Sequence, residues 1–301
     1  MSNLCDLIGR DKKHLVQLCL PYERITRPLK FPVIVQEKLD GVFVIAYVDK
    51  EGECSFYSRT GEEYVSMGHL KKDFVNLAKN TGLSFFLFEA YNPDYSQSVI
   101  SGWCRDTKST HHNLWAYIHD VFTYEEFLGE QKVPCYWYRF KRLYNTGGRY
   151  FYLFRIDPRF IDNIEDLLYL KEEVEEKGGE GVIIRDPNSC DYYPGKRKAN
   201  LIKWKKTLTF DLKVVGVSNG KGKGKYRNML GRLICQDAAG KEILVGSGLT
   251  DEQRKAWWEN PLLITGKIVE VEAMCLSTKG ILREPRFKGI RHDKAEVDLI
   301  C

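Results

Sequence analysis

The sequence predicts an α+β protein whose sheets are mainly antiparallel, followed by a small C-terminal β-barrel. Short runs rich in valine, isoleucine and aromatic residues, such as 31–37 and 42–48, are bounded by turn residues and are typical of strands. Only a few stretches, such as 69–79, repeat apolar residues at helical spacing. After about residue 208 the pattern changes to short strand-like runs linked by glycine-rich turns, which indicates a second domain.

In the first domain, Asp40-Gly41 is a strong turn signal between the runs 31–37 and 42–48, so these two runs are expected to form a β-hairpin. This arrangement would place Lys38 at the end of a mostly buried strand, next to a tight turn. Further strands are predicted at residues 55–59, 85–88, 114–122, 149–156, 182–184 and 201–205.

Two helices are expected in the first domain. The helix at 69–79 should stop at Gly82, because glycine readily adopts the left-handed conformation that ends a helix. The second helix is expected to begin at a capping box formed by Asp162 and Glu165 and to end at Gly178-Gly179.

The C-terminal part is typical of a small five-stranded barrel of the oligonucleotide-binding (OB) type. One helix, 251–258, is expected to begin at Thr250, with Gln253 three residues later. The predicted domains are therefore residues 1–207 and residues 208–301. The strand-like runs of the second domain are residues 212–217, 230–235, 241–245 and 267–275.

The composition limits the class of protein. The chain has 301 residues, 43% of them hydrophobic, which is ample for a sizeable core. No apolar run approaches the roughly 20 residues that cross a membrane, and the N-terminus lacks a signal-peptide pattern, so no membrane partner is expected. The nine cysteines are scattered and at least fourteen residues apart, which excludes CxxC zinc sites and argues against a disulfide framework. A reducing, intracellular compartment is therefore expected.

The net charge of +5 conceals an asymmetry between the two parts of the chain. Residues 196–301 hold 22 lysines and arginines against 12 acidic residues, whereas residues 1–195 hold 24 against 29. Basic side chains also cluster within 196–198, 203–206 and 221–227. This distribution favours a polyanionic partner that is held mainly by the C-terminal part, because solvated surface charge explains such clustering less well.

Lys38 is the first candidate for chemistry. A lysine at the edge of a core must be solvated, paired or used, and the carboxylate of Asp40 follows two residues later. One interpretation is a nucleophilic lysine, and the other is an ordinary hairpin with a solvated lysine. The KxDG string alone is too common to decide between them.

Other short strings follow in a fixed order and carry a resemblance. Together they are similar to the covalent nucleotidyltransferases, and most closely to the minimal ATP-dependent DNA ligases of viruses and phages. The similarity spans residues 31 to 294 and implies an adenylation domain followed by an OB-fold domain. The strings are EKLDG (37–41), SRTG (58–61), FLFEAY (86–91), YIHDVF (117–122), EGVIIRDP (180–187), LIKWKK (201–206), REPRF (283–287) and GIRHDK (289–294).

The resemblance implies that Lys38 attacks the α-phosphate of ATP and becomes a lysyl-AMP adduct. The AMP would then pass to the 5′-phosphate of a DNA nick, and a 3′-hydroxyl would displace it. A free lysine has a pKa near ~10.4, and only the unprotonated amine attacks. Lys203 and Lys205 are expected to lower the pKa of Lys38 by their positive charge. A divalent cation, normally Mg²⁺, would neutralise the phosphates.

The resemblance also implies roles for other side chains. Asp40 would orient Lys38 and bind metal, Glu89 would bind ribose or metal, and Glu180 would bind metal. Two of these positions keep ordinary alternatives, because Glu180 could simply end a helix and Lys205 could be a solvated strand residue. The remaining assignments are Lys203 and Lys205 on the α-phosphate, Arg59 on ATP and the nick 5′-phosphate, Arg283 and Arg291 on the pyrophosphate, and Gln36 and His119 on adenine.

The sequence departs from the family pattern at three places. Phe43 stands where many members have an arginine, as in KxDGxR, so Arg59 is expected to carry more of the phosphate contacts. His119 stands where an aromatic ring usually stacks on adenine, and Tyr117 or Phe122 could replace it. The stretch 217–229 is short for a clamp loop. Its cations are expected to contact the DNA backbone, with a solvated hairpin tip as the alternative: Lys221, Lys223, Lys225 and Arg227.

The partner implied is nicked duplex DNA, bound by a monomer located in the cytoplasm, at the nucleoid, or in a host cell if the source is viral. Three other functions stay open: an mRNA capping guanylyltransferase that uses GTP, an RNA ligase, and a catalytically silent nucleic-acid-binding module. The REPRF string favours the DNA ligase over the capping enzyme. NAD as the adenylate donor is not expected, because zinc-type cysteine pairs are absent.

Overall fold

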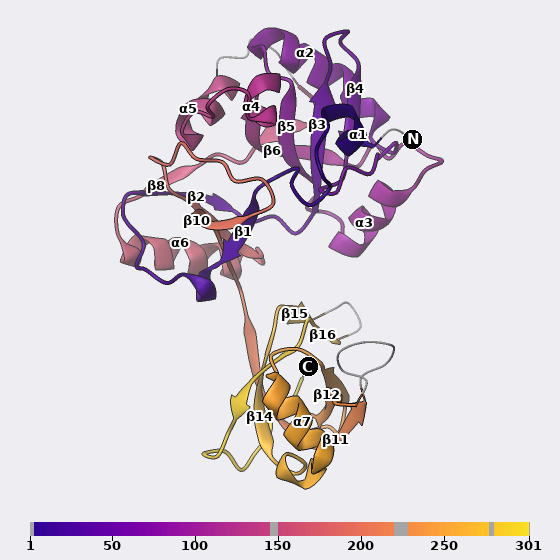
Figure 1. The fold of residues 1–301 in the computed structure, drawn as a ribbon, viewed down its shortest axis with the longest axis vertical. Coiled ribbons are helices and arrows are strands. Elements are labelled where there is room, and N and C mark those ends of the chain that lie inside the picture. The colour runs from indigo at the N-terminus through magenta and orange to yellow at the C-terminus, as the bar shows by residue number, and fades with distance from the viewer. Residues whose placement is uncertain (1–2, 145–149, 220–227, 277–279, 301) are drawn as a thin grey trace. The chain divides into compact units, whose positions relative to one another are not determined.

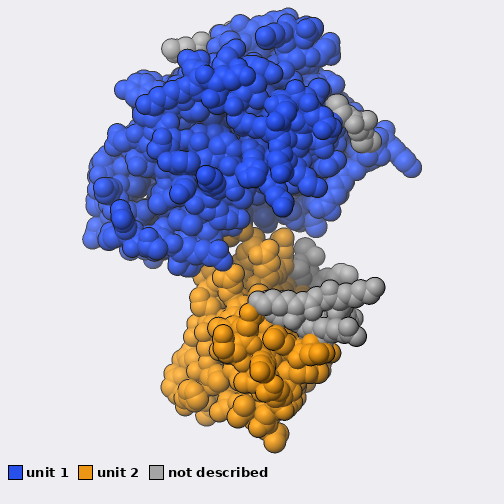
Figure 2. Space-filling view, in the orientation of Figure 1, with its two compact units in different colours: residues 1–204 blue, residues 205–301 orange. Residues whose placement is uncertain are grey.

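The computed structural model describes residues 3–144, 150–219, 228–276 and 280–300 (Figure 1). The chain divides into two compact units, residues 1–204 and residues 205–301, which Figure 2 shows in different colours. The functional division into an adenylation domain over 1–207 and an OB-fold domain over 208–301 stays a prediction. Among the described residues, no helix has the length and apolar character needed to cross a bilayer.

The first unit is built on two five-stranded sheets, here called the first and second sheets. The strands of the first sheet are, in order, β1 (Leu18–Pro21), β10 (Arg197–Lys205), β9 (Gly181–Arg185), β2 (Val33–Glu37) and β8 (Arg159–Ile161). Those of the second are β4 (Cys54–Tyr57), β3 (Val42–Val48), β5 (Phe85–Tyr91), β6 (Trp115–Phe122) and β7 (Leu153–Arg155). Most pairings are antiparallel, and only β1 with β10 and β6 with β7 are described as parallel. The predicted α+β class is therefore confirmed.

The predicted hairpin of residues 31–48 is wrong. Both strands form, but β2 pairs with β8 and β9, whereas β3 pairs with β4 and β5 in the other sheet. The segment 38–41 therefore crosses from one sheet to the other. A turn signal such as Asp40-Gly41 predicts that the chain changes direction, but the partner of each buried strand is decided by long-range packing.

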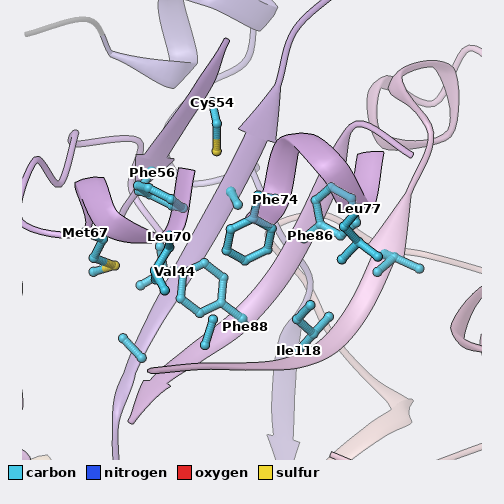
Figure 3. Close-up of a cluster of buried hydrophobic side chains, with 14 of the residues drawn as sticks. Val44, Cys54, Phe56, Met67, Leu70, Phe74, Leu77, Phe86, Phe88 and Ile118 are labelled. Atoms are coloured by element: carbon cyan, nitrogen blue, oxygen red, sulfur yellow. The ribbon is translucent and has the colours of Figure 1, made fainter. Parts of the chain in front are cut away.

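Helices cover both sheets of the first unit. Helix α2 (Lys71–Thr81) packs on the second sheet, where the ring of Phe74 lies 5.4 Å from that of Phe86 and 5.2 Å from that of Phe88 (Figure 3). Its end at Gly82, with φ 69°, is as predicted. The shorter elements are α1 (Leu4–Ile8), α3 (Gln97–Arg105), α4 (Tyr124–Leu128), α5 (Tyr136–Phe140), η1 (Tyr22–Arg24), η2 (Gly68–Leu70) and η3 (Lys141–Leu143).

Helix α6 (Ile164–Glu176) packs against the first sheet through Leu167, Leu170 and Val174. The predicted capping box of Asp162 and Glu165 is wrong by one residue. Asn163 is the N-cap, and its side chain accepts a hydrogen bond from the backbone of Asp166 at 2.8 Å. An asparagine amide oxygen satisfies the free N–H of the first turn as well as a carboxylate does, so sequence alone did not separate the two candidates.

The second unit contains a five-stranded sheet in the order β13 (Glu242–Val245), β12 (Leu230–Gln236), β11 (Leu208–Asn219), β14 (Ile268–Ala273) and β17 (Arg286–Ile290). A parallel bridge between Ser247 and Arg286 joins the chain after one edge strand to the other edge strand. Helix α7 (Asp251–Glu259) has the predicted capping box of Thr250 and Gln253, and Trp257 packs on Phe287. The remaining elements are η4 (Pro261–Leu263), β15 (Cys275–Leu276) and β16 (Leu282–Arg283).

One disulfide joins Cys135 and Cys190, which are 55 residues apart. The sequence argues against a disulfide framework, and this pair is an exception to that pattern, because the fold brings together two segments whose distance in sequence gives no pairing signal. The other described cysteines that the structure resolves as free are Cys5, Cys19, Cys54, Cys104 and Cys235.

A buried ionic network links the two sheets of the first unit. Asp120 on β6 accepts two hydrogen bonds from Arg139 on α5, at 2.6 and 2.8 Å. Arg185 on β9 contacts the same carboxylate at 3.3 Å and donates to the amide oxygen of Gln36 on β2 at 3.3 Å. Burial opposes ionisation of Asp120, but the two arginines outweigh it and hold the pKa of Asp120 below its usual value.

Replacing Asp120 by asparagine is expected to destabilise the protein by about 3–5 kcal/mol, because two arginines would lose the charge that compensates their burial. Urea denaturation at pH 7 measures this. The matched control is Asp157→Asn, whose carboxylate is 64% exposed and 3.7 Å from Arg155; a change within about 0.5 kcal/mol is expected there. Equal effects of the two substitutions would contradict the role of the network.

Candidate active site

The site is centred on the segment that crosses between the two sheets. After β2 ends, the backbone N–H of Lys38 still donates to the carbonyl of Gly181 on β9 at 2.9 Å. At the other end of the segment, Gly41 lies against β5, where a Cβ atom would clash with the carbonyl oxygen of Ala90 and come within 2.7 Å of the Cγ atom of Glu89. The segment is thus held at both ends, and Lys38 is presented where the two sheets meet.

Lys38 forms an ion pair with Glu180, with 2.5 Å between Nζ and Oε2. The two side chains are only 21% and 9% exposed. Glu180 is positioned by the chain between α6 and β9, where Gly179 approaches Val174 closely enough to leave no room for a side chain. Glu180 thus pairs with Lys38 across the junction of β2 and β9.

Burial favours the neutral amine and would lower the pKa of Lys38, but the attraction of Glu180 and Glu89 outweighs it and the pKa lies above its usual value. The resting lysine is therefore a protonated ammonium group. The lowering expected from Lys203 and Lys205 does not occur in this structure, because the nearby carboxylates dominate the local charge.

Glu89 provides a second carboxylate beside Lys38. It lies on β5, directly across from Phe43 on β3 and from Tyr117 on β6. Burial raises the pKa of Glu89 to about 7; Lys38 and Arg59 oppose this rise, and the charges of Glu180 and Asp40 add to it. Four of the predicted site residues therefore lie near Glu89, within electrostatic range of one another.

Arg59 and Phe43 form the cationic side of the site. Arg59 follows β4 in an exposed turn, and its guanidinium carbon lies 4.7 Å from the centre of the Phe43 ring. The Phe43 ring also lies 5.5 Å from the ring of His119. Phe43, which stands where the family usually has an arginine, thus contacts both Arg59 and His119.

His119 occupies a β-bulge. Leu87 pairs with Asp120 and Phe88 pairs with Ile118, so His119 is the extra residue of β6 between them. Bulges commonly re-aim a side chain at functional sites. Burial, together with the positive charges of Arg185, Arg59 and Lys38, lowers the pKa of His119 to about 3, so the imidazole is neutral. Its Nδ1 atom is buried and has no hydrogen-bond partner among the described atoms.

The residues considered for adenine recognition differ in availability. Phe122 is fully buried in the core against Phe127 and Tyr192, so it is not available to a ligand. Tyr117 lines a cavity of about 210 Å³ together with Glu37 and Leu39, which flank Lys38. The amide of Gln36 is engaged, because it donates to the carbonyl of Ile156 at 2.5 Å and accepts from Arg185.

The other predicted site residues lie on β10 or in the second unit. Lys203 lies on β10, which β9 separates from β2 in the first sheet, and the Nζ atom of Lys205 lies 3.2 Å from the sulfur of Met274 in the second unit. Arg283 and Arg291 also belong to the second unit, where Arg291 pairs with Asp211 at 3.2 Å and with Asp293 at 2.8 Å. The predicted DNA-binding residues Lys221, Lys223, Lys225 and Arg227 lie outside the described residues.

Sequence reasoning missed two members of the site. Arg185 was part of the EGVIIRDP string but had no role, and it proves to be a buried link between Gln36 and Asp120. The available signal was a charged residue directly after the predicted strand 182–184, whose residues are all apolar. Phe43 was noted only for the arginine it replaces, because a contact with Arg59 depends on the pairing of β3 with β4.

The carboxylates of Asp40, Glu89 and Glu180 are oxygen donors of the kind that Mg²⁺ prefers. In the part of the chain that the structure describes, however, no group of three or more histidine, cysteine or acidic side chains is arranged to hold a metal ion by itself. This arrangement fits an Mg²⁺ ion held by one or two carboxylates together with the phosphates of a ligand, which is the usual manner in nucleotide-binding sites.

The sequence is similar to known DNA ligases. Residues 221–291 match the family model described as a DNA ligase OB-like domain. The DNA ligase of Enterobacteria phage T4 is 24% identical over 305 residues, which covers 82% of this chain and 61% of that ligase. The DNA ligase of African swine fever virus (strain Badajoz 1971) is 27% identical, covering 89% of this chain and 65% of that protein. The chain thus spans less than two thirds of the length of these relatives.

Solved structures show the same fold. A structure of a Lig E DNA ligase, from a study of DNA binding with a minimal scaffold, superposes with a TM-score of 0.70, at 19% identity, over 92% of this chain and 98% of that one. The ATP-dependent DNA ligase from bacteriophage T7, in complex with ATP, superposes with a TM-score of 0.53 at 17% identity, over 93% of this chain and 99% of that one. These likenesses confirm the predicted architecture.

Gly41→Ala is expected to destabilise the protein by about 1–3 kcal/mol, because the added methyl group must displace β5 at Glu89 and Ala90. Chemical denaturation measures the change in the free energy of unfolding. Gly102→Ala is the matched control, since a Cβ atom at Gly102 in α3 meets nothing within 4 Å. A Gly41 variant as stable as the Gly102 variant would show that the crossing segment is not held as described.

Glu180→Gln is expected to lower the pKa of Lys38, because burial of the ammonium group would lose its nearest opposing charge. Lys38 should then react faster with an amine-directed acetylating reagent between pH 8 and 9, as measured by mass spectrometry of the labelled peptide. The control is Glu173→Gln, whose partner Lys177 is 72% exposed. Unchanged or slower labelling of Lys38 in the Glu180 variant would refute the assigned charge balance.

Proposed function

We propose that this chain, which is homologous to the DNA ligases of phages and viruses, seals nicks in duplex DNA with ATP as the adenylate donor. The observation that supports this most directly is the site itself. A largely buried lysine pairs with one carboxylate and feels the charge of a second, with an arginine nearby, at the junction of the two sheets. An amine beside charge-neutralising groups suits nucleotidyl transfer, which depends on positioning and electrostatics.

In the first step, the Lys38 nitrogen would attack the α-phosphorus of ATP. A phosphorus–nitrogen bond forms, the bond to the bridging oxygen breaks, and pyrophosphate leaves. An oxygen of the nick 5′-phosphate would then attack the same phosphorus and release the lysine. Finally the 3′-hydroxyl would attack the 5′-phosphorus, so that the phosphodiester forms and AMP departs.

The lysine must lose its proton before it can attack. Glu180 Oε2, at 2.5 Å, is the nearest acceptor for that proton. Mg²⁺ bound with the triphosphate would supply positive charge that competes with Lys38 for Glu180 and Glu89, and so would lower the pKa of the amine. Asp40 and Glu89 would share in holding that ion.

The roles of the other predicted residues are proposed from their side-chain type alone. Lys203 and Lys205 would contact the α-phosphate, Arg283 and Arg291 the pyrophosphate, and the cations of 221–227 the DNA backbone. Tyr117 and His119 are the aromatic candidates beside adenine. We also propose that the protein acts as a monomer.

An mRNA capping guanylyltransferase or an RNA ligase would use the same lysine. The match of residues 221–291 to a DNA ligase OB-like domain supports the DNA ligase. Parallel assays separate the three activities, because only a capping enzyme would form its adduct with GTP, and only an RNA ligase would prefer to seal nicks between RNA strands.

Incubation with α-labelled ATP and Mg²⁺ is expected to label the protein covalently. Lys38→Ala should abolish the label, because the attacking amine is removed, and Lys38→Arg should also abolish it, because guanidinium remains protonated. Denaturing gel electrophoresis measures the adduct. Lys79→Ala, at an exposed position on α2, should label as the wild type does. A Lys38→Ala protein that labels normally would overturn the choice of nucleophile.

A further inference from the structure

Arg59 is held without using its hydrogen-bond donors. Its guanidinium carbon lies 4.7 Å above the ring of Phe43, and among the described residues it forms neither an ion pair nor a hydrogen bond. Arg139 is the contrasting case in the same unit, because its planar group donates to Asp120 at 2.6 and 2.8 Å and to Pro134. The donors of Arg139 serve the fold, whereas those of Arg59 stay available to a ligand.

An aromatic ring can orient a guanidinium group while leaving its N–H bonds unoccupied. The attraction acts between the positive charge and the negative face of the ring, so the donors at the edge of the guanidinium plane are not consumed. A carboxylate partner would hold the arginine more strongly, but it would compete with an anionic ligand for the same donors.

The Phe43 ring is itself fixed in place. Phe43 lies near the start of β3, which pairs with β5 along residues 42–47 and with β4 through residues 45–48. Its residue position faces Glu89 across the strands, and its ring contacts His119 at 5.5 Å. The histidine is neutral, so it supports the ring without repelling Arg59.

We propose that Phe43 is a positioning residue that holds Arg59 ready to donate to the terminal 5′-phosphate of a nick. This inference rests on the proposed ligase function and deepens it. The ligand class is a phosphomonoester, whose oxygens match the planar fork of arginine. This proposal gives a role to Phe43, which stands where many family members have an arginine. Phe43 would orient Arg59 and would not itself bind the phosphate.

The test measures how well the protein distinguishes two nicked duplexes that differ only in a 5′-phosphate or a 5′-hydroxyl end. The adenylylated protein is used in EDTA, so that binding is measured without transfer of AMP. Phe43→Leu is expected to reduce the preference for the phosphate end by about fivefold, which corresponds to a cation–π energy of about 1 kcal/mol. Phe43→Tyr should retain the preference, because it keeps an aromatic face.

Phe151→Leu is the matched control, because it removes an aromatic ring that is 81% exposed. Its preference for the phosphate end is expected to equal that of the wild type. Circular dichroism and the denaturation midpoint of each variant show whether the fold is intact. If Phe43→Leu is less stable, Phe43→Tyr decides the question, since a purely structural role would not make discrimination follow aromatic character.

A double-mutant cycle with Arg59→Gln distinguishes positioning from a separate contact. If Phe43 acts through Arg59, the leucine substitution has no further effect on discrimination in the glutamine background. Additive effects, or an unchanged preference in Phe43→Leu alone, would overturn the proposal. A wild-type protein that forms lysyl-AMP but shows no preference between the two ends would also overturn it, without touching adenylylation. Failure to form lysyl-AMP would instead count against the proposed function.

Discussion

The ion pair of Lys38 and Glu180 is the interaction on which the site depends. Lys38 directly follows β2 and Glu180 directly precedes β9. The pair therefore lies where the segment 38–41 leaves the first sheet and crosses to the second. Both side chains are largely buried, and a buried charge without a partner costs several kcal/mol. The pair therefore ties the conformation of the crossing segment to the charge state of the candidate nucleophile.

This pairing explains why Lys38 rests protonated, although only a neutral amine can attack. The carboxylates that make a charged lysine tolerable at a buried position also keep it protonated. If Mg²⁺ binds together with the triphosphate, as proposed, its positive charge would compete with Lys38 for these carboxylates. The neutral amine would then appear only when the nucleotide is bound. Such coupling would protect the amine from unproductive reactions in the absence of substrate.

A second layer of charges holds the frame around the site. Asp120, Arg139 and Arg185 cross-link β6, α5 and β9, and Arg185 reaches Gln36 two residues before the nucleophile. Because such groups are costly to bury unless all are paired, the network favours one relative placement of the two sheets. The bulge at His119 lies directly beside this network, so the same strand both anchors the frame and presents an imidazole to the site.

The choice of Lys38 as the central residue rests on the resemblance carried by the order of short strings, and it stays a prediction. The strand patterns were sufficient to predict the α+β class, an OB-type C-terminal part and the capping box of α7. These follow from local properties, namely side-chain periodicity, turn chemistry and residue type. Only the tertiary structure decided that residues 31–48 span two sheets, that Cys135 meets Cys190, and that Phe43 contacts Arg59. It also decided that Lys38 rests protonated, because a pKa depends on burial and on charges far away in the sequence. Strand partners and charge environments depend on contacts between residues that are far apart in the chain, so local patterns in a single sequence do not predict them.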